Sequence, residues 1–222
     1  MEDKPVIREV KVWDPLVRVF HWFLVLAFAI SYLTGDEWDD WGSVHEISGY
    51  LILGLIVFRI IWGVVGSQYA RFSDFLYSPK VVFAYLKSLL TTHPKHYLGH
   101  NPAGGCMVIL LLVSILAISI TGLKLLAVEH NEGPLAQVSI QLPSLISVAE
   151  ARKMPGNTMD ENAGQEKGDE FWKEIHEFFA NFTLFLVIVH ILGVVVSSYL
   201  HKENLARAMV TGKKPIHDDQ DR

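Results

Sequence analysis

One apolar run near the carboxyl end of the chain carries two histidines, and this feature constrains the fold most. The run extends from Phe171 to Leu200 and contains His176 and His190, 14 residues apart. A histidine inside an apolar run of membrane-spanning length is costly unless the protein uses it. On an α-helix both imidazoles lie within about 40° of each other and roughly 21 Å apart along the axis. This separation suits two haem irons stacked across a bilayer; the alternative is a pair of polar anchors at the ends of a span.

The composition agrees with a membrane protein. Of the 222 residues, 50% are hydrophobic and 19% are charged, and the charges cluster between the apolar runs. Cys106 is the only cysteine, which excludes an internal disulfide, a CxxCH haem attachment and a four-cysteine iron–sulfur site. Any haem is therefore held without a covalent bond, by axial histidines. The first apolar run follows a polar lead, so we expect no cleavable signal peptide.

The first predicted span covers residues 15–34. Asp14 followed by Pro15 is typical of an N-cap and a first helical position. The span carries His21, with Arg18 one turn earlier on the same face. This arrangement suits an imidazole on a haem iron and a guanidinium on a propionate. The alternative is that Arg18 reaches toward lipid headgroups and His21 bonds to a neighbouring helix.

The second predicted span covers residues 44–65. Ser43 and Glu46 have the spacing of a capping box, which places His45 in the first turn. Arg59 follows 14 residues later, on the same face and about 21 Å further along the helix. It would therefore lie at the level of the other haem and serve one of its propionates. The alternative is a basic anchor at the end of the span.

The remaining chain predicts one further span and several connections. The third span, over residues 103–126, contains no histidine; Lys124 near its end would pair with a propionate or reach toward water. Residues 79–90 are amphipathic and suit the membrane interface, and we interpret His93, His96 and His100 as surface residues. The prediction is a four-span domain over 1–205, with spans at 15–34, 44–65, 103–126 and 171–200, an outer loop over 128–170, whose residues 154–168 are predicted as coil, and a cytoplasmic tail over 206–222.

The basic residues predict the orientation. They concentrate in the N-terminal lead, in residues 66–101 and in the C-terminal tail, whereas the two other connections are acidic. By the positive-inside rule both termini are cytoplasmic. His21 and His190 then lie near the inner surface, and His45 and His176 near the outer one. The four histidines thus form two layers of two, as two bis-histidine haems require. His201, near the same helix face as His190, is a rival ligand close to water.

Five segments carry a family resemblance: WDPLVRVFHW (13–22), SVHEISGYLILGLIVFRIIWG (43–63), NPAGG (101–105), IHEFFANFTLFLVIVH (175–190) and ENLARAMVTGKK (203–214). The chain resembles the bacterial cytochrome b561 family and the b-type cytochrome subunit of nickel–iron hydrogenases, in its shorter four-helix branch. The resemblance implies two b haems on His21, His45, His176 and His190, and quinone exchange. Stand-alone members often carry paired histidines where this chain has Ser197 and Ser198, which favours the partner-coupled branch.

We therefore predict an all-α, integral membrane four-helix bundle with two b-type haems stacked across the bacterial inner membrane. Bis-histidine iron leaves no open position, so the expected role is electron transfer between quinone and a redox partner. That partner would be a hydrogenase, a c-type cytochrome or a dehydrogenase, and the acidic outer loops favour a basic docking surface. The chain would be a subunit embedded in lipid, with no nucleic-acid partner. The sequence does not assign its oligomeric state. Two alternatives are a stand-alone superoxide:quinone oxidoreductase and a non-redox metal transporter or structural bundle, although the spans lack the carboxylates that transporters usually need.

The topology is directly testable. Reporter fusions at the C-terminus should be active only in the cytoplasm, and fusions within residues 150–168 only in the periplasm, because the basic connections stay inside. A periplasmic C-terminus would reverse the side of every histidine.

Overall fold

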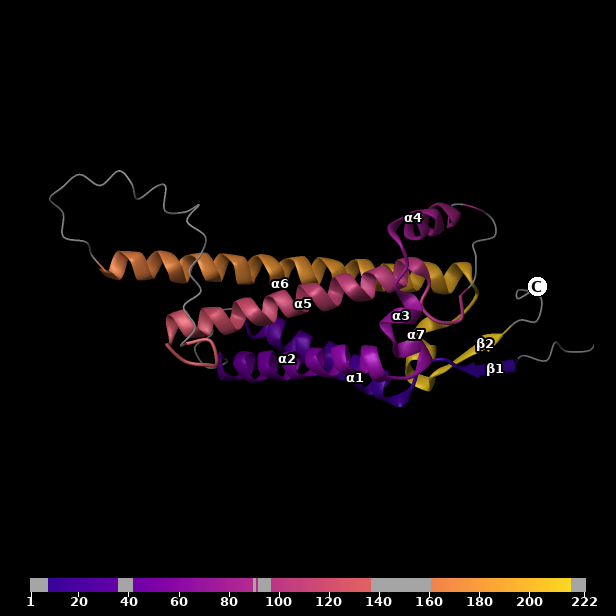
Figure 1. Ribbon diagram of the computed structural model, residues 1–222, viewed down its shortest axis with the longest axis horizontal. Helices are drawn as coiled ribbons and strands as arrows, with labels where there is room; N and C mark the ends of the chain where they lie inside the picture. Colours follow the sequence, from indigo (N-terminus) through magenta and orange to yellow (C-terminus); the bar gives the residue numbers. More distant parts are fainter. Residues whose placement is uncertain (1–7, 36–41, 90, 92–96, 137–160, 217–222) are drawn as a thin grey trace, which may run out of the picture. The chain divides into compact units, whose positions relative to one another are not determined.

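The computed structural model describes residues 8–35, 42–89, 91, 97–136 and 161–216, and this part of the chain is mostly helical (Figure 1). Four helices are long and apolar enough to cross a membrane, the last of them over Glu170–Leu200. Many of their large apolar side chains are exposed, as lipid contact requires. The predicted four apolar spans are therefore confirmed as helices; they are α1 (Pro15–Leu33), α2 (Gly42–Val65), α5 (Pro102–Glu129) and α6 (Glu161–Leu200).

Two of these helices begin at the predicted caps. Asp14 Oδ1 accepts a hydrogen bond from Val17 N at 2.9 Å, and Pro15 is the first residue of α1. Asn101 Oδ1 accepts from Gly104 N at 2.7 Å, and α5 begins at the following proline. Each cap satisfies one N–H that the first helical turn leaves unpaired.

The other two helices begin earlier than predicted. α2 starts at Gly42, so Ser43 lies inside the helix and not before it. α6 starts at Glu161, so the prediction of coil over residues 154–168 is wrong from Glu161 onward. Residues 137–160 of the predicted outer loop lie outside the described residues.

Three short elements follow α2: η1 (Gln68–Ala70), α3 (Phe72–Phe75) and α4 (Pro79–Ser88). α4 has the predicted amphipathic character. Tyr85 is buried, whereas Phe83 and Leu86, on other sides of the helix, and Val81 are exposed. The location of α4 at a membrane interface remains a prediction.

The two ends of the described chain pair with each other (Figure 1). β1 (Arg8–Lys11) and β2 (Lys213–Ile216) form an antiparallel two-stranded sheet with Arg8 opposite Ile216. A short helix, α7 (Leu205–Thr211), precedes β2. The all-α prediction missed this sheet, because its strands are short, charged and without an apolar alternation.

Gly212 makes the close approach of these ends possible. It ends α7 with φ of 81°, in the left-handed region that favours glycine. Its carbonyl accepts from Val12 N and Trp13 N at 2.9 and 3.1 Å. A Cβ at this position would lie 2.7 Å from Trp13 O. Val12 and Trp13 pack with Ala208 in a small buried cluster, so the predicted tail is packed at least around Ala208.

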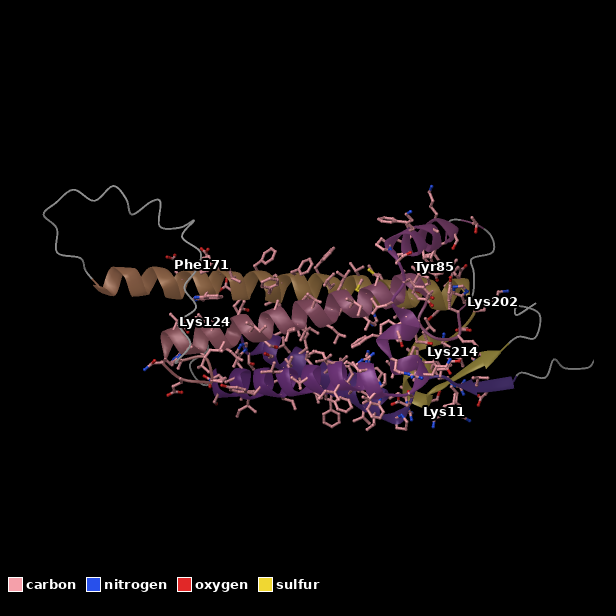
Figure 2. All side chains as sticks on the ribbon, in the orientation of Figure 1. Lys11, Tyr85, Lys124, Phe171, Lys202 and Lys214 are labelled. Carbon is pink, nitrogen blue, oxygen red and sulfur yellow. The ribbon has the colours of Figure 1, made fainter. Side chains whose placement is uncertain are left out.

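A buried ion pair joins β2 to Glu203, two residues before α7. Lys214, labelled in Figure 2, places Nζ 3.3 Å from Glu203 Oε2, and its Nζ also donates to Tyr97 O at 3.5 Å. Both side chains of the pair are buried. Burial lowers the pKa of Lys214, and the charge and hydrogen bond of Glu203 oppose that shift.

The chain divides into two compact units. One contains Met1–Leu116 and Asn181–Arg222, and the other contains Ala117–Ala180. α1 packs against α2 within the first unit. Also within it, Thr183 Oγ1 of α6 donates to Ser114 Oγ of α5 at 3.2 Å, and both side chains are buried.

The buried ion pair predicts a stability effect. Glu203→Gln leaves the Lys214 ammonium buried without its counter-charge, and we expect a loss of about 3 kcal/mol in the free energy of unfolding. Glu9→Gln is the matched control, because the Lys213–Glu9 pair is exposed at 57% and 54% and contributes at most about 1 kcal/mol. Thermal unfolding in detergent, followed by circular dichroism, measures both. Equal effects of the two variants would contradict the prediction.

Candidate functional site

His21 and His190 lie together in the first unit. His21 is half-buried on α1, its ring edge-on to Trp22 with centroids 5.1 Å apart. Its Nδ1 is enclosed and has no hydrogen-bond partner. His190 of α6 is close enough for its charge to act on the His21 ring. The two histidines predicted for the inner layer therefore come from different helices and approach each other.

His45 is oriented by the end of α1. Its Nδ1 lies 2.9 Å from Ser31 O, and a carbonyl only accepts, so Nδ1 carries the hydrogen. Ser31 is in the last turn of α1, where backbone carbonyls lack helical partners. The bond satisfies this carbonyl and leaves the ring lone pair on Nε2, the arrangement found in metal-binding histidines.

His176 is oriented in a similar way in the second unit. Its Nδ1 lies 3.1 Å from Thr121 Oγ1 on α5. The Thr121 hydroxyl already donates to Ile118 O at 3.0 Å, so it accepts from the imidazole. Gly122 faces the same ring, and a Cβ there would lie 2.9 Å from His176 Cε1. A hydrogen bond and a missing side chain together fix the position of this ring.

His45 and His176 belong to different compact units. Each has its own orienting partner, but their pairing in the outer layer stays a prediction.

Arg59 is buried on α2 and is only 3% exposed. Its Cζ lies 5.0 Å from the Phe72 ring centroid and 5.9 Å from that of Phe75. Its Nη1 is enclosed and has no hydrogen-bond partner. The structure therefore does not support an anchor that reaches outward from the span, and one donor of the guanidinium remains unused.

Arg18 points toward the C-terminal segment. Its Nη1 donates to Val210 O at 2.5 Å, whereas its Nε is enclosed without a partner. Arg18 also lines a mainly apolar cavity of about 290 Å³ with Trp22 and Met209. The carbonyl bond occupies part of the guanidinium that was predicted to serve a propionate.

Lys124 is buried in the second unit, at 8% exposure. The predicted alternative that it reaches toward water is therefore not supported. Its role toward a propionate remains a prediction.

His100 is a site residue that the sequence did not predict. Its ring centroid lies 4.6 Å from that of Trp13 and 4.4 Å from that of Phe75, and its Nδ1 is enclosed without a partner. Burial lowers its pKa from 6.5 to about 3, and the charges of Arg59, Lys214 and His190 add to the shift. His100 is half-buried, so the prediction of a surface residue missed these contacts, because its aromatic neighbours are distant in sequence. His93 and His96 lie outside the described residues.

These residues fit a haem. Two imidazoles from different helices lie within electrostatic range of each other, two others have Nδ1 bonded to an acceptor, and a buried guanidinium retains an unused donor. Bis-histidine iron needs the imidazoles, and a propionate needs the cation.

Comparisons with known proteins support this chemistry. The family model described as prokaryotic cytochrome b561 matches residues 12–212. A relative from Rhodobacter capsulatus, named "Probable Ni/Fe-hydrogenase B-type cytochrome subunit", is 24% identical over 99% of this chain and 87% of its own. Relatives of the same name from Rhizobium leguminosarum bv. viciae and Azotobacter vinelandii are 26% and 27% identical. Those two alignments cover 59% and 53% of this chain, and 64% and 60% of the relatives. No solved structure gives a significant match.

The Thr121 contact predicts an electronic effect on a haem bound by His176. Thr121→Val keeps the side-chain shape but removes the acceptor, so the imidazole becomes a weaker donor to iron. We expect the midpoint potential of one haem to rise and its retention to fall about 10- to 100-fold. Thr121→Ser keeps a hydroxyl and is the matched control. Redox titration and haem content measure both, and identical behaviour of the two variants would exclude this role of Thr121.

Proposed function

Because the chain belongs to the prokaryotic cytochrome b561 family, we propose that it is a membrane dihaem cytochrome b that carries electrons between the quinone pool and a periplasmic or membrane-bound redox partner. The family assignment makes the cofactor haem b and the general role electron transport. We further propose that it binds two haems, and we propose their ligands and the two redox partners below.

The approach of His21 and His190 is the observation that carries it. The two residues are 169 positions apart in the chain, yet α1 and α6 bring their rings within electrostatic reach. A bis-histidine haem needs its two imidazoles from facing helices. We assign these residues to the inner haem.

The outer haem is assigned to His45 and His176. Support comes from their equivalent hydrogen bonds, in which Nδ1 donates to Ser31 O in one case and to Thr121 Oγ1 in the other. The 14-residue spacing of His176 and His190 on α6 gives each haem one ligand from the same helix.

The chain's residues hold the cofactor and tune it. The four imidazoles would hold the haems, which would supply one-electron transfer chemistry when bound. Arg59 offers Nη1 to a propionate, and Arg18 offers its Nε. The exposed apolar faces of the four spans contact lipid, and we place them in the bacterial inner membrane with both termini cytoplasmic.

A nickel–iron hydrogenase is the redox partner that we favour. The relatives described above carry the name of a hydrogenase cytochrome subunit, and one of them aligns over nearly the whole chain. This favours an electron-transfer subunit over the stand-alone superoxide:quinone oxidoreductase. In this proposal electrons pass between the hydrogenase and quinone through the two haems.

Paired substitutions test the ligand assignment. His21→Ala and His190→Ala should each lose the same spectral component, and His45→Ala and His176→Ala the other, because losing one imidazole weakens the retention of that haem. Haem content, the visible spectrum and redox titration of the purified protein measure this.

His201→Ala is the control, since His201 lies near the same face of α6 beyond His190. The His201→Ala variant should retain both haems. In a separate measurement on the wild type, a quinol analogue should reduce both haems. A haem lost in His201→Ala but kept in His176→Ala would overturn the two-layer assignment. A wild-type protein without b-type bands would overturn the function itself.

A further inference from the structure

Two buried nitrogens without a hydrogen-bond partner belong to side chains that share a neighbour at the inner end of the first unit. They are Nη1 of Arg59, a donor, and Nδ1 of His100, which is a donor in the tautomer that carries its hydrogen there. The Phe75 ring contacts both residues: its centroid is 4.4 Å from that of His100 and 5.9 Å from Arg59 Cζ. Phe75 is itself 1% exposed, so both residues contact the same buried ring.

Two nearby carboxylates, those of Glu203 and Asp14, are already engaged, and Asp74, whose Oδ2 lies near Gly99, bonds to neither nitrogen. Glu203 pairs with Lys214 at 3.3 Å. Asp14 accepts from Val17 N at 2.9 Å, from Trp62 Nε1 at 3.2 Å and from the Ser67 hydroxyl, although its charge also acts on Arg59. A buried guanidinium with an unpaired donor is unfavourable, and a neutral acceptor would not balance its charge. The two donors therefore require an anionic acceptor.

A carboxylate suits these donors best. It offers two oxygens, one for each donor, and hydrogen bonds from a guanidinium to a carboxylate are strong. Arg59 lies six residues before the end of α2, about 9 Å along the axis, which is deep for a lipid phosphate. His190, the proposed iron ligand, is near enough for its charge to act on His100.

We propose that Arg59 and His100 together bind one propionate of the inner haem. His100 is then a cofactor-binding residue that no sequence motif identifies, and Trp13 and Phe75 hold its ring in place. The inference rests on the proposed function, since it requires a haem on His21 and His190.

The test uses the purified holoprotein with both haems bound. His100→Phe removes the donor and keeps a planar ring, whereas His100→Gln retains an amide donor. Arg59→Gln removes the positive charge, and His130→Gln, at an exposed histidine, is the control. The readouts are the propionate bending band in resonance Raman spectra and the midpoint potential of the haem that His21→Ala loses.

We expect His100→Phe and Arg59→Gln to shift the propionate band and to lower the potential of that haem alone. A propionate without its donors carries more negative charge and stabilises ferric iron. His100→Gln should lie closer to the wild type, and His130→Gln should match it.

Three outcomes would overturn the inference while leaving the proposed function intact. One is an unchanged band and potential in His100→Phe. Another is loss of the bis-histidine spectrum of the inner haem in His100→Gln, which would make His100 an axial ligand. A third is a fall in bound phospholipid phosphorus in His100→Phe with an unchanged Raman band, which would identify the anion as a lipid phosphate. A wild-type protein without two haems would instead remove the proposed function.

Discussion

The structure depends on one constraint: an imidazole or guanidinium inside an apolar span needs a partner. Water is scarce at that depth, so an unpaired polar group is costly. His45 and His176 meet the requirement with one nitrogen each, through a helix-end carbonyl and a threonine hydroxyl. Arg59 and His21 do not, because each has an enclosed nitrogen without a partner. A bound cofactor would provide a partner for Arg59.

The contact between His45 and Ser31 also explains the geometry of the first two spans. α1 ends at Leu33, and the Ser31 carbonyl lies in its last turn, where it also accepts a longer bond from Thr34 Oγ1 at 3.4 Å. Its bond to Nδ1 ties the end of α1 to the first turn of α2, across the connection between them. A carbonyl in the last turn also carries the negative end of the helix dipole, which increases the electron density of the imidazole. The same hydrogen bond therefore satisfies a carbonyl at the end of α1 and orients the His45 imidazole.

Periodicity made most of the architecture predictable. Apolar length predicted the four spans, local caps predicted the starts of α1 and α5, and the spacing of His176 and His190 predicted a shared face. Contacts between distant segments were not predictable. β1 and β2 lie at opposite ends of the chain and carry charge without alternation. His100 is enclosed by Trp13 and Phe75, which the sequence separates widely, and Thr121 is one of several hydroxyl residues in an apolar helix.

The two arginines show that sequence spacing predicts which helix face a residue occupies but not which group it bonds to. Arg18 and Arg59 each share a helix face with a candidate ligand, so the sequence treats them alike. In the structure Arg18 gives Nη1 to the carbonyl of Val210, and this bond ties α1 to the C-terminal segment. Arg59 lies against two phenylalanine rings that offer no acceptor. A cation among aromatic rings is stabilised by their faces but not neutralised. Arg59 therefore keeps a donor for an anion, whereas Arg18 uses one of its donors in a structural hydrogen bond to Val210 O.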